Sequence, residues 1–393
     1  MHNVSGSKIG RTKAWKRLLI MLSVFSIGLS IIGWGGHQRA YADSPLTSTD
    51  FYRAYEDIDA VEAAKKGGMT KETAAFLSSE EQPIDEKAAV INAIYAGGSE
   101  WKDRHYADDY AKLVFSKTLD ALNPAELGGD DLFVLGYLNV MDHYLQVDNV
   151  AWLVKAKQAL PSSLTVSLIY AVAFSQMEFD CSWEYVRQTL EDSNLQADLR
   201  PEAVDFITDY MKLYEGSPCS AEQAALLANN IETEELLASS VVLFIDQPTV
   251  LNHGVRAFAL PGEPNVSPYA TKGTTLVPLR FIADAFGAKV GYDPKKHTVT
   301  IQTASASFTF VPNEHRYVSN GKQIAMNGAM EVKQGRAYVP LRVIAEALGK
   351  HVYYNQGLII ISDNKAIDPS NKHDQELANA IRQRLLKGEP VGG

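Results

Sequence analysis

The stretch TLVPLRFIADAFGAKVGYD, residues 275–293, recurs 62 residues later as AYVPLRVIAEALGKHVYYN, residues 337–355. In each copy a short apolar run ends in proline, which fits the first turn of a helix because no backbone N–H is needed there. Apolar side chains then follow at i, i+3, i+4 and i+7, as in a helix with one buried face. A glycine ends the helix and strand-forming residues follow. Each copy is therefore predicted to be a strand, a helix and a β-hairpin, and the two copies to share one core.

The same residue types stand at matching positions of the two copies, and we expect structural roles for all of them. The proline begins the helix, the leucine and isoleucine belong to its buried face, and the glycine stops it. These positions are Pro278, Leu279, Arg280, Ile282 and Gly287 in the first copy and Pro340, Leu341, Arg342, Ile344 and Gly349 in the second.

The matching arginines have two interpretations. Arg280 and Arg342 could together bind an anion. Alternatively, each could form an ion pair one helical turn along its own helix, because Asp284 and Glu346 lie four positions later. We favour the structural interpretation.

The pattern VPLR-x-IA-[DE]-A-x-G, present twice and followed in the first copy by TVTI, resembles the copper amine oxidase N-terminal-like domain, also called the stalk domain. The resemblance covers residues 241–363. It implies a compact α+β domain of antiparallel strands around a helix, in an exported protein of the kind common in Gram-positive bacteria. It implies neither copper nor another cofactor, because the stalk domain is distinct from the catalytic domain of amine oxidases. The connection at residues 259–270 is longer than is usual in the family.

Three tyrosines were assigned to faces of the predicted hairpins. Tyr292 and Tyr354 stand where the family usually has Trp, and we expect both to face the core. Because side chains alternate along a strand, Tyr353 should then face solvent, where it could contact a ligand such as a sugar ring.

From Asp50 to Ser239 apolar residues recur at spacings of three and four, which predicts helices throughout. The sequence SAEQ at residues 220–223 has capping-box spacing. Paired helices suggest stacked tetratricopeptide-like hairpins, but that repeat's marker residues do not recur with its period. We therefore favour an irregular all-helical domain.

Near Val241 the pattern changes to runs of β-branched and aromatic residues. Asn320-Gly321 between two such runs predicts a tight hairpin. The predicted fold is multidomain, an all-α domain followed by an α+β stalk-type domain of antiparallel strands with two short helices. The predicted bounds are 1–42 for a signal peptide, 43–240 for the helical domain, 241–363 for the stalk domain and 364–393 for a tail with a short helix.

The first 42 residues have the three parts of a Sec-type export signal. Basic residues precede the apolar run LLIMLSVFSIGLSIIGW, and AYA ends at Ala42. That run is 17 residues long, shorter than the roughly 20 that a membrane span needs, although an uncleaved anchor is the alternative. We expect cleavage after Ala42, a secreted or cell-wall-associated product, and no stable membrane span in the mature chain.

Charge divides the mature chain in two. Residues 43–245 contain 35 Asp and Glu against 14 Lys and Arg, whereas residues 246–393 contain 12 against 17. The first part should repel a polyanion, which argues against nucleic acid as a partner.

Cys181 and Cys219 are the two cysteines of the chain. In an exported protein such a pair suggests a disulfide. Two buried reduced thiols are the alternative.

The sequence contains no recognised catalytic motif. It lacks the His-x-His pair and the quinone-forming tyrosine motif of amine oxidases, as well as metalloprotease, serine hydrolase and phosphate-loop signatures. Paired carboxylates at 57 and 59, 108 and 109, and 130 and 131 are interpreted as solvated or helix N-terminal charges.

These observations predict a non-enzymatic exported cell-envelope protein without cofactor or metal. Its stalk-type domain would bind, or act as a spacer, at the cell wall or on an extracellular protein or polysaccharide. The alternatives are a wall-acting hydrolase with its site in the helical domain, and a helical partner-binding protein tethered by the stalk domain.

Overall fold

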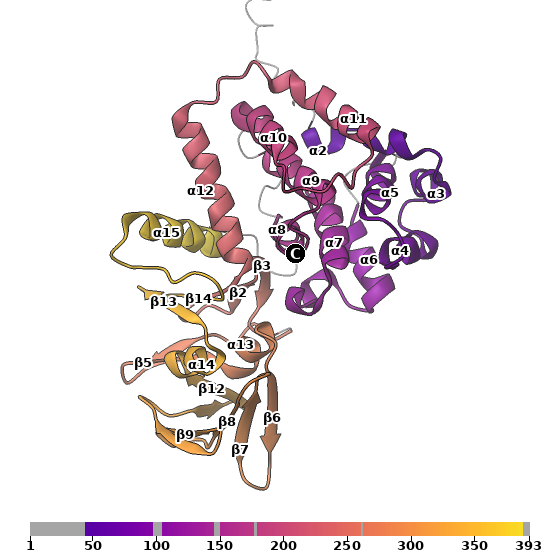
Figure 1. Cartoon of the computed structure of the whole chain (residues 1–393). Coiled ribbons are helices and arrows are strands. Elements are labelled where there is room, and N and C mark those ends of the chain that lie inside the picture. The colour runs from indigo at the N-terminus through magenta and orange to yellow at the C-terminus, as the bar shows by residue number, and fades with distance from the viewer. Residues whose placement is uncertain (1–43, 97–103, 145–149, 177–178, 261, 388–393) are drawn as a thin grey trace, which may run out of the picture. The chain divides into compact units, whose positions relative to one another are not determined.

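The computed structural model describes residues 44–96, 104–144, 150–176, 179–260 and 262–387 (Figure 1). The predicted signal peptide lies outside these residues. The described residues belong to one compact unit.

The first part of this unit is helical, and the predicted fold class is confirmed. Ser220 and Gln223 form the predicted capping box, in which each side chain bonds the other residue's backbone N–H. Gly136 allows two helices to pack closely, since an added Cβ would lie 2.7 Å from the backbone nitrogen of Leu153. The α-helices are α2 (Pro45–Ser48), α3 (Asp59–Gly67), α4 (Lys71–Ser78), α5 (Ile84–Ala96), α6 (Tyr106–Phe115), α7 (Gly129–Asp142), α8 (Ala151–Ala159), α9 (Leu164–Phe174), α10 (Ser182–Glu191), α11 (Pro201–Met211) and α12 (Ala221–Ala238).

Strands begin directly after α12 and form three antiparallel sheets. The orders are β13-β14-β1-β2-β3, β10-β9-β8-β7-β6 and β11-β12-β5-β4. The strands are β1 (Ser240–Phe244), β2 (Thr249–Asn252), β3 (Val255–Phe258), β4 (Tyr269–Thr271), β5 (Thr274–Pro278), β6 (Lys289–Asp293), β7 (Thr298–Gln302), β8 (Ser307–Phe310), β9 (Arg316–Ser319), β10 (Lys322–Ala325), β11 (Glu331–Lys333), β12 (Arg336–Pro340), β13 (His351–Asn355) and β14 (Leu358–Ser362). The hairpin predicted at Asn320-Gly321 joins β9 to β10 and is confirmed.

The sequence repeat corresponds to a local two-fold arrangement. The first copy is β5, α13 (Leu279–Ala285), β6 and β7, and the second is β12, α14 (Leu341–Leu348), β13 and β14. Strands β5 and β12 pair antiparallel with Val277 opposite Val339, which are equivalent residues of the two copies. Pairing of a strand with its own equivalent is self-complementary, as at an interface with two-fold symmetry.

The helix faces of both copies lie in one core. Leu279, Ile282 and Ile344 are fully buried and Leu341 is 6% exposed. Pro278 and Pro340 end the strands and cap the helices, one position before the place expected for them. Gly287 and Gly349 follow the helices with positive φ of 70° and 67°, a conformation that glycine adopts without strain.

The two copies are extended differently. The hairpin β6–β7 continues into β8, β9 and β10 along the chain, whereas β14 pairs with β1, which precedes the first copy in sequence. The sheet that contains β14 is also covered on its outer face by α12 and by α15 (Lys372–Lys387), the helix predicted in the tail (Figure 1).

This cover overturns the assignment of Tyr353 to a solvent-exposed face. Tyr353 is only 5% exposed because it packs with Ile381 and Leu385 of α15. Tyr292 and Tyr354 stand opposite core residues of the neighbouring strands, on the core face as predicted, but they are 57% and 50% exposed. Each lies on an edge strand of its sheet. A ligand contact at Tyr353 is therefore not supported.

Candidate functional site

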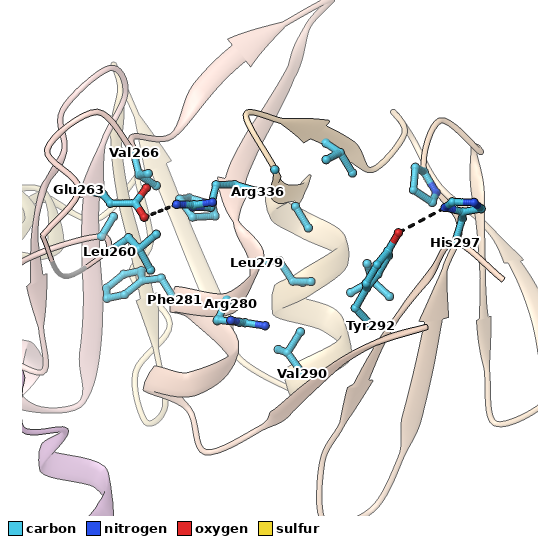
Figure 2. A pocket seen from close by; sticks show the side chains of 17 residues that line it. Leu260, Glu263, Val266, Leu279, Arg280, Phe281, Val290, Tyr292, His297 and Arg336 are labelled. Carbon is cyan, nitrogen blue, oxygen red and sulfur yellow. Dashed lines mark hydrogen bonds and ion pairs between the residues drawn. The ribbon is translucent and has the colours of Figure 1, made fainter. Parts of the chain in front are cut away.

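A cavity of about 860 Å³ lies beside the first copy (Figure 2). Four segments form it, namely the connection from β3 to β4, the start of α13, the hairpin β6–β7 with the nearby Pro312, and the hairpin β11–β12. Its size is within the usual range for small-molecule sites, roughly 300 to 1,000 Å³. The lining residues are Ala259, Leu260, Glu263, Val266, Pro278, Leu279, Arg280, Phe281, Val290, Tyr292, His297, Val299, Pro312, Val332, Gly335, Arg336 and Ala337.

One wall of the cavity is formed by the long connection that precedes the first copy. Residues 259–268 join β3 to β4, whereas the shorter segment 326–330 joins β10 to β11, the matching strands before the second copy. Ala259 and Val266 are 1% and 5% exposed and belong to the core, so they hold this connection in place at both ends. The Ala259 amide also donates to the Pro248 carbonyl, 3.0 Å away.

An ion pair fixes the long connection to the hairpin β11–β12. The Arg336 guanidinium donates through Nη2 to a Glu263 carboxylate oxygen (Figure 2). The side chains are 37% and 40% exposed, so solvent screens the pair. This wall of the cavity therefore contains a guanidinium that Glu263 holds in place. The Nε atom of Arg336 is buried without a hydrogen-bond partner among the described residues.

The opposite wall is the hairpin β6–β7. The Asp293 side chain accepts hydrogen bonds from the Lys295 and Lys296 amides at 2.9 and 3.2 Å, which stabilises the turn. Beside this turn, Tyr292 Oη and His297 Nδ1 lie 3.3 Å apart (Figure 2). The hairpin therefore presents an aromatic ring with a polar edge at the cavity.

Arg280 provides a cation that lies near the Asp284 carboxylate without forming an ion pair with it. It is exposed, and among the described residues it makes no hydrogen bond or ion pair, so the expected pair with Asp284 is not formed. Burial raises the pKa of Asp284, and the nearby charge of Arg280 offsets this only in part. The second copy likewise lacks, within the described chain, an ion pair between Arg342 and Glu346. The anion-binding interpretation, which we had placed second, fits Arg280 because it lines the cavity.

Cys181 and Cys219 are joined in a disulfide, with their Cα atoms 4.7 Å apart. The bond links the N-terminal ends of two helices, since Cys181 caps α10 and Cys219 lies just before α12. It is remote in sequence from every segment of the cavity, and its role is structural.

Three of the paired carboxylates of the helical part each have a partner of their own. Asp130 pairs with the buried Lys87, and Asp131 accepts a hydrogen bond from the Tyr110 hydroxyl at 3.3 Å. Asp108 pairs with Lys112, one turn along α6. These contacts fit structural roles and give no support to a catalytic carboxylate pair.

Two features are absent from the described residues. No group of three or more His, Cys, Asp or Glu side chains is placed to hold a metal ion. No helix in the described ranges is long and apolar enough to cross a membrane.

Residues 260–361 match the family model of the copper amine oxidase N-terminal domain, which confirms the resemblance drawn from the repeat. The matched segment contains both copies and most of the cavity lining. That domain is a non-catalytic, stalk-type domain. No curated protein matches the chain.

Sequence reasoning missed most of this site. It singled out Arg280 but not Glu263, Tyr292, His297 or Arg336 as cavity residues. The extra length of the connection at 259–270 was visible in the sequence. It was not interpreted as part of a binding site.

Proposed function

We propose that this is a non-enzymatic, exported cell-envelope protein whose stalk-type domain is a binding module. The observation that carries the proposal is the cavity beside the first copy. Apolar walls with a few polar groups at fixed positions are typical of ligand sites, and a domain that served only as a spacer would not need them.

Further features support the envelope as the place of action. The N-terminal pattern of basic residues, apolar run and AYA sequence is that of an export signal. The stalk-bearing part, residues 246–393, carries a net charge of +5, from 17 basic and 12 acidic residues. A basic surface favours association with anionic wall polymers or extracellular proteins.

The test is binding of residues 43–393 to a purified envelope fraction with and without a block in the cavity. Val332 lines the cavity and is 53% exposed, so Val332→Trp should fill space without disturbing the core. Ala270→Trp is the matched control, because Ala270 is exposed on β4 at the position equivalent to Val332. We expect Val332→Trp to abolish binding and Ala270→Trp to preserve it. Equal binding by both variants would contradict the proposal.

A further inference from the structure

We infer that the cavity binds an extended peptide segment bearing a carboxylate, with Arg280 as the residue that holds the carboxylate. This inference rests on the proposed binding function and adds the chemistry of the ligand.

The first argument comes from the strand edges. β6 is the last strand of its sheet and β11 is the first strand of another, and both contribute residues to the cavity lining. An edge strand has backbone N–H and C=O groups on its outer side that no neighbouring strand pairs. A peptide in extended conformation can use these groups by adding itself as a further strand.

Side-chain alternation gives the second argument. Val290 and Tyr292 are two positions apart on β6, and both line the cavity. Residues two positions apart project from the same face of a strand. Val332 of β11 is also exposed and apolar. A peptide lying along the edge of β6 would therefore place every second side chain against an apolar surface, and Val332 would add one apolar contact from β11.

Charge gives the third argument. Glu263 is already paired with Arg336, whereas Arg280 has no such partner among the described residues. The fixed charges of the lining therefore leave one cation in excess, which the nearby Asp284 offsets in part. In the adjoining turn the exposed Lys295 and Lys296 outnumber the single Asp293. A guanidinium binds a carboxylate by charge-assisted hydrogen bonds. Figure 2 shows Arg280 among the apolar side chains Leu279, Phe281 and Val290, so a ligand carboxylate there would have apolar groups beside it.

The same features favour a peptide over a neutral glycan. A sugar chain presents many hydroxyl groups, whereas most of the residues that line this cavity are apolar. Burying hydroxyl groups without hydrogen-bond partners is unfavourable.

The test is selection of short random linear peptides on residues 43–393, followed by affinity measurements on an enriched peptide. We expect enriched peptides to combine Asp or Glu with alternating apolar residues. Replacing their carboxylate by the amide should weaken binding about tenfold or more, as for the loss of a charged hydrogen bond. Arg280→Glu should have the same effect. Arg342→Glu changes the same exposed residue type in the second copy and should leave affinity unchanged.

Several outcomes would overturn the inference. One is that the selection enriches no peptide. Another is that the amide peptide binds with the same affinity as the carboxylate peptide. A third is that Arg280→Glu and Arg342→Glu change the affinity equally. Binding of wall saccharide fragments in place of peptides, if Val332→Trp abolished it, would overturn the peptide assignment and leave the proposed function standing. Envelope binding that is insensitive to Val332→Trp would instead contradict the proposed function.

Discussion

The strands β7 and β14 occupy equivalent places in the two copies and differ in what covers them. β7, with the sequence TVTIQ, alternates between half-buried and buried residues, whereas all five residues of β14, LIIIS, are buried. The less buried side of β7 carries Thr298, Thr300 and Gln302. The outer face of the sheet that contains β14 is covered by α12 and α15. The same strand, helix and hairpin unit therefore occurs in two settings. In the first copy its hairpin forms a wall of the cavity, and in the second copy its hairpin lies beneath α12 and α15.

This difference shows that the repeated sequence determines the residues of the core. It does not determine which other elements pack around each copy. Residues that face the shared core are nearly the same in both copies, as Leu279 and Leu341 illustrate. The features that distinguish the copies lie outside the repeated stretch. They are the long connection at 259–268 for the first copy and the helix α15 for the second.

The largest expected effect tests whether the helices of both copies belong to one common core. Leu279→Ala and Leu341→Ala should each lower the free energy of unfolding by about 2 to 5 kcal/mol, because each leaves a cavity in the core. Urea denaturation of residues 43–393 measures this. The whole compact unit is needed, since a fragment of residues 241–363 would expose the face that α12 and α15 cover. An unchanged midpoint for either variant would show that its helix face is not part of the common core.

The second prediction concerns a part of the molecule away from both copies. Reduction of the disulfide between Cys181 and Cys219, which are 38 positions apart, should cost roughly 4 kcal/mol by the loss of loop closure. Ligand binding should persist at temperatures where the reduced protein stays folded. Thiol titration of exported, unreduced protein provides a check, because two free thiols would refute the bond.

A smaller effect distinguishes two histidines that lie 62 positions apart. His253 is 1% exposed, and its ring nitrogens lie 3.0 and 2.9 Å from the carbonyl oxygens of Ala238 and Ala285, whereas His315 is exposed. Burial, followed by the charge of Lys155, lowers the pKa of His253, while the two carbonyls and Asp363 act in the opposite sense.

Because folding lowers the pKa of His253, protonation favours the unfolded chain as the pH falls. Stability linked to His253 is therefore present above the ordinary histidine pKa, near 6.5, and is lost as the pH falls below it toward the lowered folded value. The melting temperature should decline less between pH 7 and 5 in His253→Gln than in the wild type. His315→Gln is the control and should keep the wild-type slope. A His253→Gln slope equal to that of the wild type would contradict this account.

Much of the fold could be predicted because its signals are local. The proline, the helical spacing and the glycine of each copy indicated α13 and α14, and Asn320-Gly321 indicated the turn between β9 and β10. Alternation correctly placed Tyr353 and Tyr354 on opposite faces, but it does not state which face another element covers. The unbroken apolar run of β14 was the better signal, because a strand buried on both faces shows no alternation.

The cavity could not be predicted in the same way. Its walls come from segments around residues 260, 280, 295 and 335, and their meeting depends on how the sheets pack. Arg280 carried the same local sequence as Arg342, so only the fold could show that one of them lines a cavity. Loop length alone did not indicate which side chains the connection would present.

The most direct test of the account compares Tyr292→Ala with Tyr354→Ala. The two tyrosines are equivalent in sequence and are 57% and 50% exposed, so their loss should affect stability alike. Tyr292 lines the cavity, and the loss of its ring from a ligand contact should weaken binding by about threefold to tenfold. The measurement is the affinity of each variant of residues 43–393 for the envelope fraction. The account predicts weaker binding for Tyr292→Ala and wild-type binding for Tyr354→Ala, and equal affinities for the two variants would contradict it.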